Sequence, residues 1–148
     1  MDFNQIASFI MTDPISVSSG VVTLVMFTFQ SSVALYQTIQ SFRSSKRSIR
    51  ELEEELGALT AVLQSLNDVA NGSNVDFSSL ELPLRRCGKA CQEFEKLVGK
   101  ITQHSSGSRT SFRDWANLTY MGGDITAFKN MIAGYKSIIM IALGDANL

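Results

Sequence analysis

Apolar residues recur at spacings of three and four along most of the chain, which is the period of an amphipathic α-helix. The pattern is clearest between residues 46 and 70, where seven positions follow it without a break: Ile49, Leu52, Leu56, Leu59, Leu63, Leu66 and Ala70. No segment alternates apolar and polar residues with a period of two, so no strands are predicted. The sequence therefore predicts an all-α fold.

Three further helices follow from the same reading. Residues 82–104 carry a stripe formed by Leu84, Cys87, Cys91, Phe94, Val98 and Ile101, with Pro83 suited to the first turn. Asp124 is suited to cap a last helix whose stripe is Ile125, Phe128, Ile132, Tyr135, Ile139 and Ala142. Between these two, a capping-box pattern at Ser111 predicts a short helix that carries Trp115, Leu118 and Met121.

The first long helix is predicted to start at Asp13 and Pro14 and to run to about Phe42, and it has no charged residue after Asp13. One stripe contains Val17, Val21, Leu24, Leu35, Ile39 and Phe42, and further apolar residues widen it most of the way round: Val22, Val25, Met26, Phe29, Val33 and Tyr36. Such a helix needs burial on all sides. Four long helices joined by short polar loops predict an up-down bundle of antiparallel neighbours, with this helix at its centre.

The same uncharged helix raises the question of a membrane span. Its length suffices for a span, since about 20 predominantly apolar residues are required. Gln30, Ser31 and Ser32 interrupt the middle of the run, however, and the three amphipathic helices that follow offer it a protein environment. A soluble core helix is the favoured interpretation, and a core helix that can leave the bundle for a bilayer stays physically open.

Composition and charge narrow the class of protein. A chain of 148 residues with 45% hydrophobic residues is about one domain long, and its net charge of −1 provides no field that would attract nucleic acid. Residues 1–12 form an extension, which we expect to add a short amphipathic helix through Phe3, Ile6, Phe9 and Ile10. The extension has no Lys or Arg, so it lacks the positive region of a secretory signal.

Chemically reactive residues are sparse. His104 is the single histidine, and Cys87 and Cys91 lack the spacing and the partners of a zinc site, so the two thiols are expected to be reduced and packed as small apolar groups. No glycine-rich phosphate loop occurs. We therefore expect no enzyme, and with it no catalytic residue, cofactor, metal or small-molecule substrate.

The sharpest charge feature is a basic cluster, defined as Arg43, Lys46, Arg47 and Arg50, at the junction of the first two long helices. In one interpretation these cations suit the end of the first helix and pair with Glu51, Glu53 and Glu54, within a run of glutamates on a solvated face. In the other they contact anionic lipid headgroups or a protein partner.

Both ends of the chain resemble one family. The stretch "DPISVSSGVVTLV" is similar to the start, and "FRDWANLTYMGGDITAFKNMIAGYKSIIMIALGDANL" to the end, of the fungal N-terminal domain of STAND (NOD-like) receptors, a domain also found in the L protein of the azaphilone pigment cluster. The resemblance covers residues 13–148. It implies a HeLo-like helical bundle of four helices with one or two short ones, at the N-terminus of a longer protein.

The resemblance also implies a function. Such domains act in the cytoplasm by self-association or with other signalling proteins, and some of them reach membranes on activation in programmed cell death. Carried over to this sequence, the candidate membrane-active helix comprises Ile15, Val17, Val21, Val22, Leu24, Val25, Met26, Phe27 and Phe29. The basic cluster would contact anionic lipids or a partner. The alternative is an interaction scaffold or oligomerisation module without membrane activity. The chain departs from the family in carrying eleven residues before Thr12.

Overall fold

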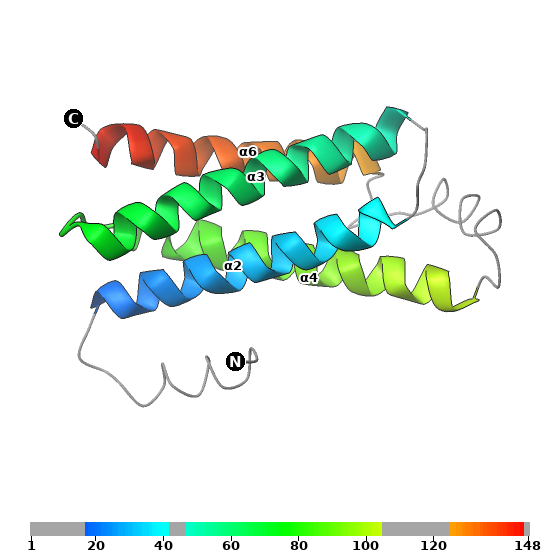
Figure 1. The fold of residues 1–148 in the computed structure, drawn as a ribbon, viewed down its shortest axis with the longest axis horizontal. Coiled ribbons are helices and arrows are strands. Elements are labelled where there is room, and N and C mark those ends of the chain that lie inside the picture. Colours follow the sequence, from blue (N-terminus) through cyan, green and yellow to red (C-terminus); the bar gives the residue numbers. More distant parts are fainter. Residues whose placement is uncertain (1–16, 42–46, 105–124, 147–148) are drawn as a thin grey trace.

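The computed structural model describes residues 17–41, 47–104 and 125–146, with the backbone alone for 17–19 and 101–104. Its elements are the helices α2 (Val17–Gln40), α3 (Arg47–Gly72), α4 (Glu81–His104) and α6 (Ile125–Ala146), with a short 3₁₀ turn, η1 (Ser78–Leu80), ahead of α4 (Figure 1). The described residues contain no strand. The prediction of an all-α bundle is confirmed.

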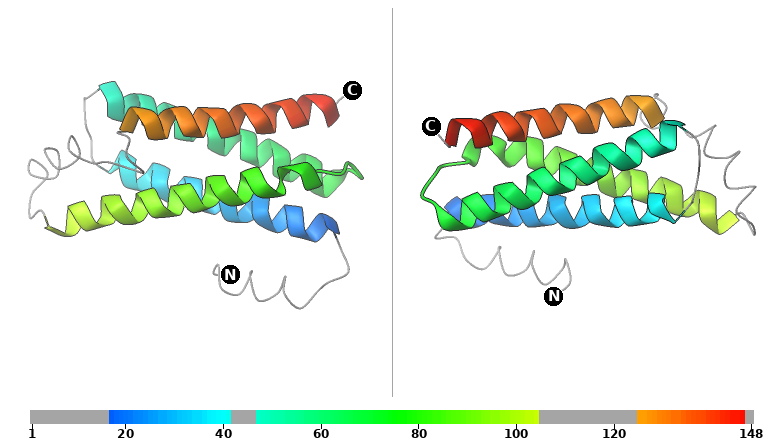
Figure 2. Two further views of the ribbon diagram at one scale, coloured as in Figure 1. Left: turned by 180° about the vertical axis from the view of Figure 1, so that it is seen from behind. Right: turned by 45° about the horizontal axis from the view of Figure 1, so that its top comes forward.

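The four helices lie side by side and alternate in direction along the chain (Figures 1 and 2). α2 packs against α3 and α4, whereas α6 packs mainly against α3 and only lightly against α4. α2 and α3 are antiparallel neighbours, as predicted. The close pairs α2 with α4 and α3 with α6 run in the same direction, however, so the expectation of antiparallel neighbours does not hold for them.

α3 supplies an unbroken row of buried leucine and isoleucine side chains to the core. Its predicted stripe is fully buried except for the half-buried Ala70, and the buried members are Ile49, Leu52, Leu56, Leu59, Leu63 and Leu66. Burying each such side chain contributes roughly 1.5 to 3 kcal/mol. This stripe is the most regular pattern in the sequence, and the structure uses it as predicted.

The stripes of α4 and α6 face the same core. On α4 the buried members are Leu84, Cys87, Cys91, Phe94 and Val98, and on α6 they are Ile125, Phe128, Ile132 and Ile139. The rings of Phe94 and Phe128 stack with centroids 4.1 Å apart and planes 14° apart, which joins the two helices where they meet. Tyr135 and Ala142 complete the α6 stripe as half-buried residues.

η1 is an element that the sequence reading missed. It follows a loop in which the carboxylate of Asp76 accepts a 2.9 Å hydrogen bond from the backbone N–H of Ser78. The turn places Phe77 and Leu80 in the core beneath the start of α4. Two apolar residues three apart, directly after an aspartate, are the local signal that would have predicted it.

α2 lies at a corner of the bundle and not at its centre, which corrects the sequence interpretation. Its packing partners are α3 and α4. Gln30, Gln37 and Gln40 are exposed on its outer side. Gln30 and Gln37 are seven residues apart and so share one helix face, which remains in water because it is lined with amides.

Several predictions lie outside the described residues. These are the helix start at Asp13 and Pro14, the amphipathic helix within residues 1–12, and the short helix predicted for residues 111–121. They remain predictions.

Candidate functional site

The buried side of α2 is polar in its middle. The core-facing line runs from Val21 and Val25 to Leu35 and Ile39, and between these pairs it passes through buried hydroxyl side chains: Thr28, Ser31 and Ser32. We call Thr28, Ser32 and the facing Thr60 of α3 the hydroxyl seam. Buried hydroxyls require hydrogen-bond partners, and the seam supplies them.

Each hydroxyl of the seam bonds within its own helix and across to another. Thr28 Oγ1 lies 2.8 Å from the Leu24 carbonyl oxygen and 2.7 Å from that of Leu84 on α4, so one proton is shared between two acceptors. Ser32 donates to the Phe29 carbonyl at 2.8 Å, and its Oγ lies 3.3 Å from Thr60 Oγ1. The seam therefore ties α2 to both of its neighbours.

Gly88 brings α2 and α4 into close approach. A Cβ at this position would lie 2.7 Å from Phe27 Cε1 and 3.0 Å from Thr28 Oγ1. The aromatic ring occupies the space that any other side chain would take. A Cβ at position 88 would therefore press on Phe27 and on Thr28, whose hydroxyl bonds to the Leu84 carbonyl.

The candidate membrane-active residues are divided between core and flank. Val21 and Val25 are buried, whereas Val22, Leu24, Met26, Phe27 and Phe29 are half-buried. Ile15 lies outside the described residues, and only the backbone of Val17 is described. Gly20–Gln40 is long and apolar enough for a span, with a mean hydropathy of 1.2, but a core helix passes the same test. Their membrane role stays a prediction.

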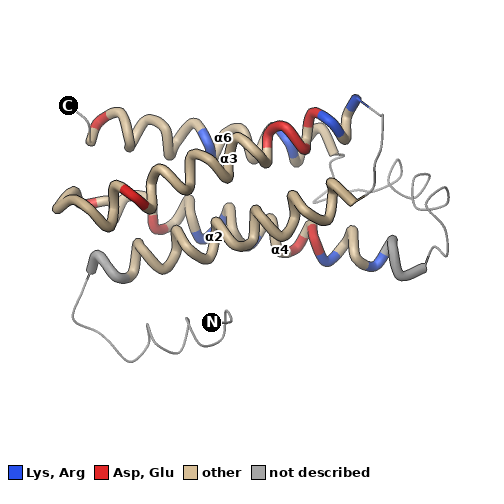
Figure 3. The backbone as a smooth tube through the Cα atoms, in the orientation of Figure 1, with Lys and Arg blue, Asp and Glu red and all other residues tan. Residues whose placement is uncertain are grey.

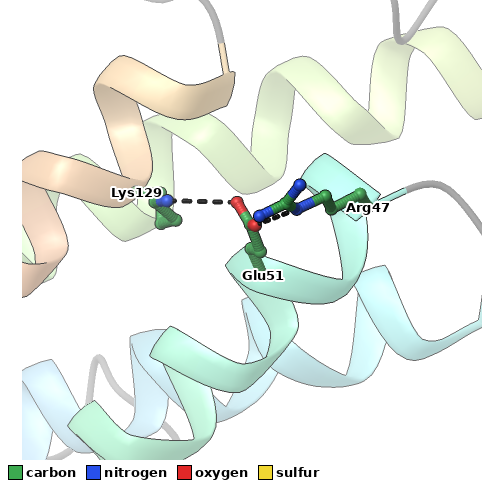
Figure 4. Close-up of polar contacts among 3 residues, drawn as sticks. All are labelled: Arg47, Glu51 and Lys129. Atoms are coloured by element: carbon green, nitrogen blue, oxygen red, sulfur yellow. Dashed lines mark hydrogen bonds and ion pairs between the residues drawn. The ribbon is translucent and has the colours of Figure 1, made fainter.

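The basic cluster is only partly described, since Arg43 and Lys46 fall outside. Arg47 and Arg50 are exposed at the start of α3. Arg47 Nε lies 2.8 Å from Glu51 Oε1, and Glu51 Oε2 lies 3.2 Å from Lys129 Nζ of α6 (Figure 4). The pairing of the cluster with Glu51 at helical spacing is therefore confirmed for Arg47.

Two glutamates of α3 pair with α6: Glu51, which stays on the solvated face as predicted, and Glu55, which is only 19% exposed and departs from that prediction. Hydrogen bonds from Arg47 and then Lys129 keep the pKa of Glu51 below its ordinary value. One turn further along, Glu55 Oε1 lies 2.6 Å from Lys136 Nζ, in a close charge contact that is not an aligned hydrogen bond. Both lysines of α6 are thus engaged by α3.

Chemical groups for catalysis do not converge within the described part of the chain. Cys87 and Cys91 are buried free thiols, as predicted, and a hydrogen bond with Cys87 together with burial raises the pKa of Cys91. No group of three or more His, Cys, Asp or Glu there could hold a metal ion. A shallow groove of 160 Å³ between α2 and α4 is lined by Phe27, Gln30, Ser31, Ala34, Gln92 and Glu95.

The sequence reading also missed an exposed apolar surface on α6. Ile138, Met140 and Ile141 are 42%, 53% and 66% exposed. The sequence of α6 has no charged residue between Lys136 and Asp145, and Figure 3 shows a tan, uncharged stretch of α6 toward its C-terminal end. The signal was present in "SIIMIAL", where apolar residues occupy positions outside the core stripe as well as within it.

The described residues thus form an all-helical bundle with exposed apolar residues on α6 and no convergent polar groups. The family model described as pigment biosynthesis cluster protein PigL N-terminal matches residues 12–148, and the chain belongs to this family. The family resemblance drawn from the two ends of the sequence is thereby confirmed. Membership supports an N-terminal domain of the fungal NOD-like receptor type. Comparison with curated proteins and with solved structures gives no match.

Proposed function

We propose that the bundle is a non-enzymatic, cytoplasmic signalling domain of a fungal NOD-like receptor-type protein. It acts by association with itself or with other signalling proteins and, once activated, through α2 at the membrane in regulated cell death. The observation that carries the proposal is the state of α2, which is uncharged from Gly20 to Gln40 and has only a third of its most apolar window buried. Family membership supports the N-terminal signalling class.

On activation, α2 would leave its buried position in the bundle and become buried in a bilayer or against a second protein surface. Separating α2 from the bundle exposes Val21, Val25, Leu35 and Ile39, which are now buried. At roughly 1.5 to 3 kcal/mol for each side chain, their exposure costs about 6 to 12 kcal/mol. A bilayer or a second protein surface must offset that cost, so α2 stays in the bundle until a trigger supplies one of them.

The hydroxyl seam is compatible with such an exchange. Thr28 and Ser32 each donate to a carbonyl of their own helix, at Leu24 and Phe29. These bonds persist when α2 separates, and only the contacts to Leu84 and Thr60 are lost. A helix whose hydroxyls are satisfied internally enters hydrocarbon at a lower cost than one with unpaired groups.

Leakage of anionic liposomes tests the proposal. We expect the protein to release an encapsulated dye and Met26→Glu, a charge on the half-buried flank of α2, to abolish release. Ala61→Glu adds the same charge at an exposed position of α3, outside the uncharged helix, and serves as the matched control for folding and net charge. Thermal melts of both variants separate misfolding from lost membrane activity. Liposomes that stay intact with folded wild-type protein would refute the membrane step.

An interaction scaffold that never opens is the second candidate function. The seam and the close approach at Gly88 favour it, because they fix α2 to both neighbours. A scaffold would leave liposomes intact while it still associates with itself or a signalling partner. The two functions are thus separated by whether leakage accompanies association.

A further inference from the structure

We infer that the exposed side of α6 pairs with the same side of α6 in a second copy of the chain, the two helices running antiparallel. The inference rests on the proposed self-association and names its surface. We call this surface the α6 face and define it by its exposed residues: Ala127, Asn130, Gly134, Ser137, Ile138, Ile141 and Asp145.

Among the described helices, α6 has fewer packing partners than its composition calls for. It is as apolar as α2, yet α2 is held by two helices while α6 packs along α3 and only lightly on α4. Ile138 and Ile141, 42% and 66% exposed, point away from both. A helix that is apolar on more than one side is stable where a further element covers it.

Charge selects a second copy as that element. The two lysines of α6 are engaged by Glu51 and Glu55, which leaves Asp145 as the one charge on the α6 face. The outer sides of α3 and α4, by contrast, carry exposed charges: Arg50, Glu54, Asp68, Arg85, Arg86, Lys89, Glu93, Lys96 and Lys100. When an uncharged face covers another uncharged face, no charged group has to leave water, and a second copy of the chain provides such a face.

Asp145 also fixes the direction. A parallel pair would place two Asp145 carboxylates together, at the negative ends of both helix dipoles. When antiparallel copies overlap over the full helix, Asp145 lies opposite Thr126, in the first turn of its partner. There the carboxylate faces the positive end of the partner's dipole.

The same register brings small residues to the crossing point. Gly134 lies opposite Ser137 of the second copy, and a Cβ at Gly134 would meet nothing within 4 Å in the single chain. Ile141 lies opposite Asn130. The two backbones can therefore approach closely while each isoleucine covers a small or short side chain of the partner.

The area available makes this a weak dimer. A helix of 22 residues is about 33 Å long, so a face roughly 10 Å wide buries on the order of 330 Å² per copy. The total of about 660 Å² is below the 1,200 Å² or more of stable interfaces. Association is thus concentration-dependent, and it strengthens when copies are held close together.

Sedimentation of the purified protein over a wide concentration range tests the α6 face. We expect a monomer–dimer equilibrium, whose dissociation constant Ile141→Glu raises at least tenfold. Leu82→Glu is the matched control, because Leu82 is an exposed apolar residue on α4, 50% exposed, and its substitution should leave the equilibrium unchanged.

Disulfide cross-linking tests the direction, since both native cysteines are buried. The double variant Gly134→Cys, Ser137→Cys should form covalent dimers. Gly144→Cys should not, because the two copies of this residue lie about 25 Å apart in the antiparallel pair. Efficient cross-linking at 144 instead would overturn the antiparallel arrangement.

Three other outcomes contradict the inference, and they differ in what else they contradict. If the Ile141→Glu variant still dimerises as the wild type does, dimerisation does not use the α6 face, and the proposed self-association still stands. A wild-type protein that is monomeric throughout, with Ile141→Glu less stable to heat, shows that another part of the same chain covers the face. A monomer whose binding to liposomes is lost in Ile141→Glu shows a lipid contact there. Leakage by α2 is measured independently of all three.

Discussion

α2 and α6 are the two most apolar helices of the described chain, and they differ in which residues face the core and which face water. α2 turns hydroxyls inward, among them Thr28 and Ser32, and amides outward at Gln30 and Gln37. α6 turns Phe128 and Ile132 inward and leaves Ile138 and Ile141 in water. Apolar content alone therefore does not tell which helix has spare surface for a partner. The positions of the few polar residues indicate which helix has apolar surface left exposed.

The two helices also differ in the polar contacts that they make with their neighbours. The inward polar groups of α2 bond across to α3 and α4 and so specify its neighbours. The polar contacts of α6 with α3 are ion pairs from Lys129 in its second turn and from Lys136 at its middle. Polar groups thus tie α2 to its neighbours at its middle, and they tie α6 to α3 over its first half only.

Removing the ring that joins α4 to α6 should have the largest effect. Phe94→Ala deletes a fully buried side chain and its stacking on Phe128, in a contact between helices that is otherwise sparse. We expect the free energy of unfolding to fall by about 3 to 5 kcal/mol in denaturant titrations. Phe29→Ala on α2, where the ring is half-buried, is the control and should cost clearly less. Equal losses would mean that the stacked pair has no special part in holding α6.

Adding a side chain where α2 and α4 approach closely should have the second largest effect on stability. Gly88→Ala places a Cβ against the Phe27 ring, and we expect a loss of about 1 to 3 kcal/mol despite the better helix propensity of alanine. Gly99→Ala is the matched control on the same helix, because a Cβ there meets nothing within 4 Å. It should be neutral or slightly stabilising. A neutral Gly88→Ala in thermal and denaturant unfolding would show that α2 is held less tightly than we describe.

Breaking an ion pair of α6 should have a smaller effect. Lys136→Met leaves Glu55, whose side chain is only 19% exposed, without its cation, and we expect a loss of about 1 to 2 kcal/mol. Adding Glu55→Gln to this variant should restore part of the loss, because no uncompensated charge remains. A double-mutant cycle measures the coupling between the two residues. Additive losses would indicate that the pair is not coupled.

The smallest effect should be the pH dependence carried by Glu51. Its pKa is lower in the folded chain than the ordinary 4.5, so its stabilising contribution is complete above that pH. The contribution is lost as the pH falls through the lowered folded value. The stability difference between wild type and Glu51→Gln should therefore narrow as melts are taken to more acid pH. Glu54→Gln removes an exposed glutamate of the same helix, for which the described residues show no ion pair, and is the matched control.

The sequence was sufficient for the four long helices, but it predicted neither η1 nor which helices pack against each other. The regular stripe of α3, from Ile49 to Leu66, predicted both the helix and its buried face, because local period and burial coincide there. The corner position of α2 was missed, although Gln30 and Gln37 mark an outer face, because valines and phenylalanines widen the apolar stripe around it. Contacts such as Glu51 with Lys129 depend on which helices pair, and the local pattern of neither helix contains that information.

The ion pairs of α6 set the order in which that helix should come away. Lys129 and Lys136 anchor its first half to α3, and no ion pair is present in the described structure beyond Lys136. Loosening should therefore begin at Ala146 and travel backward, so amide hydrogens near Ala142 should exchange faster than those near Ile132. A partner or a downstream domain that pulls on this end would peel α6 away turn by turn, starting with the turns that carry Ile141.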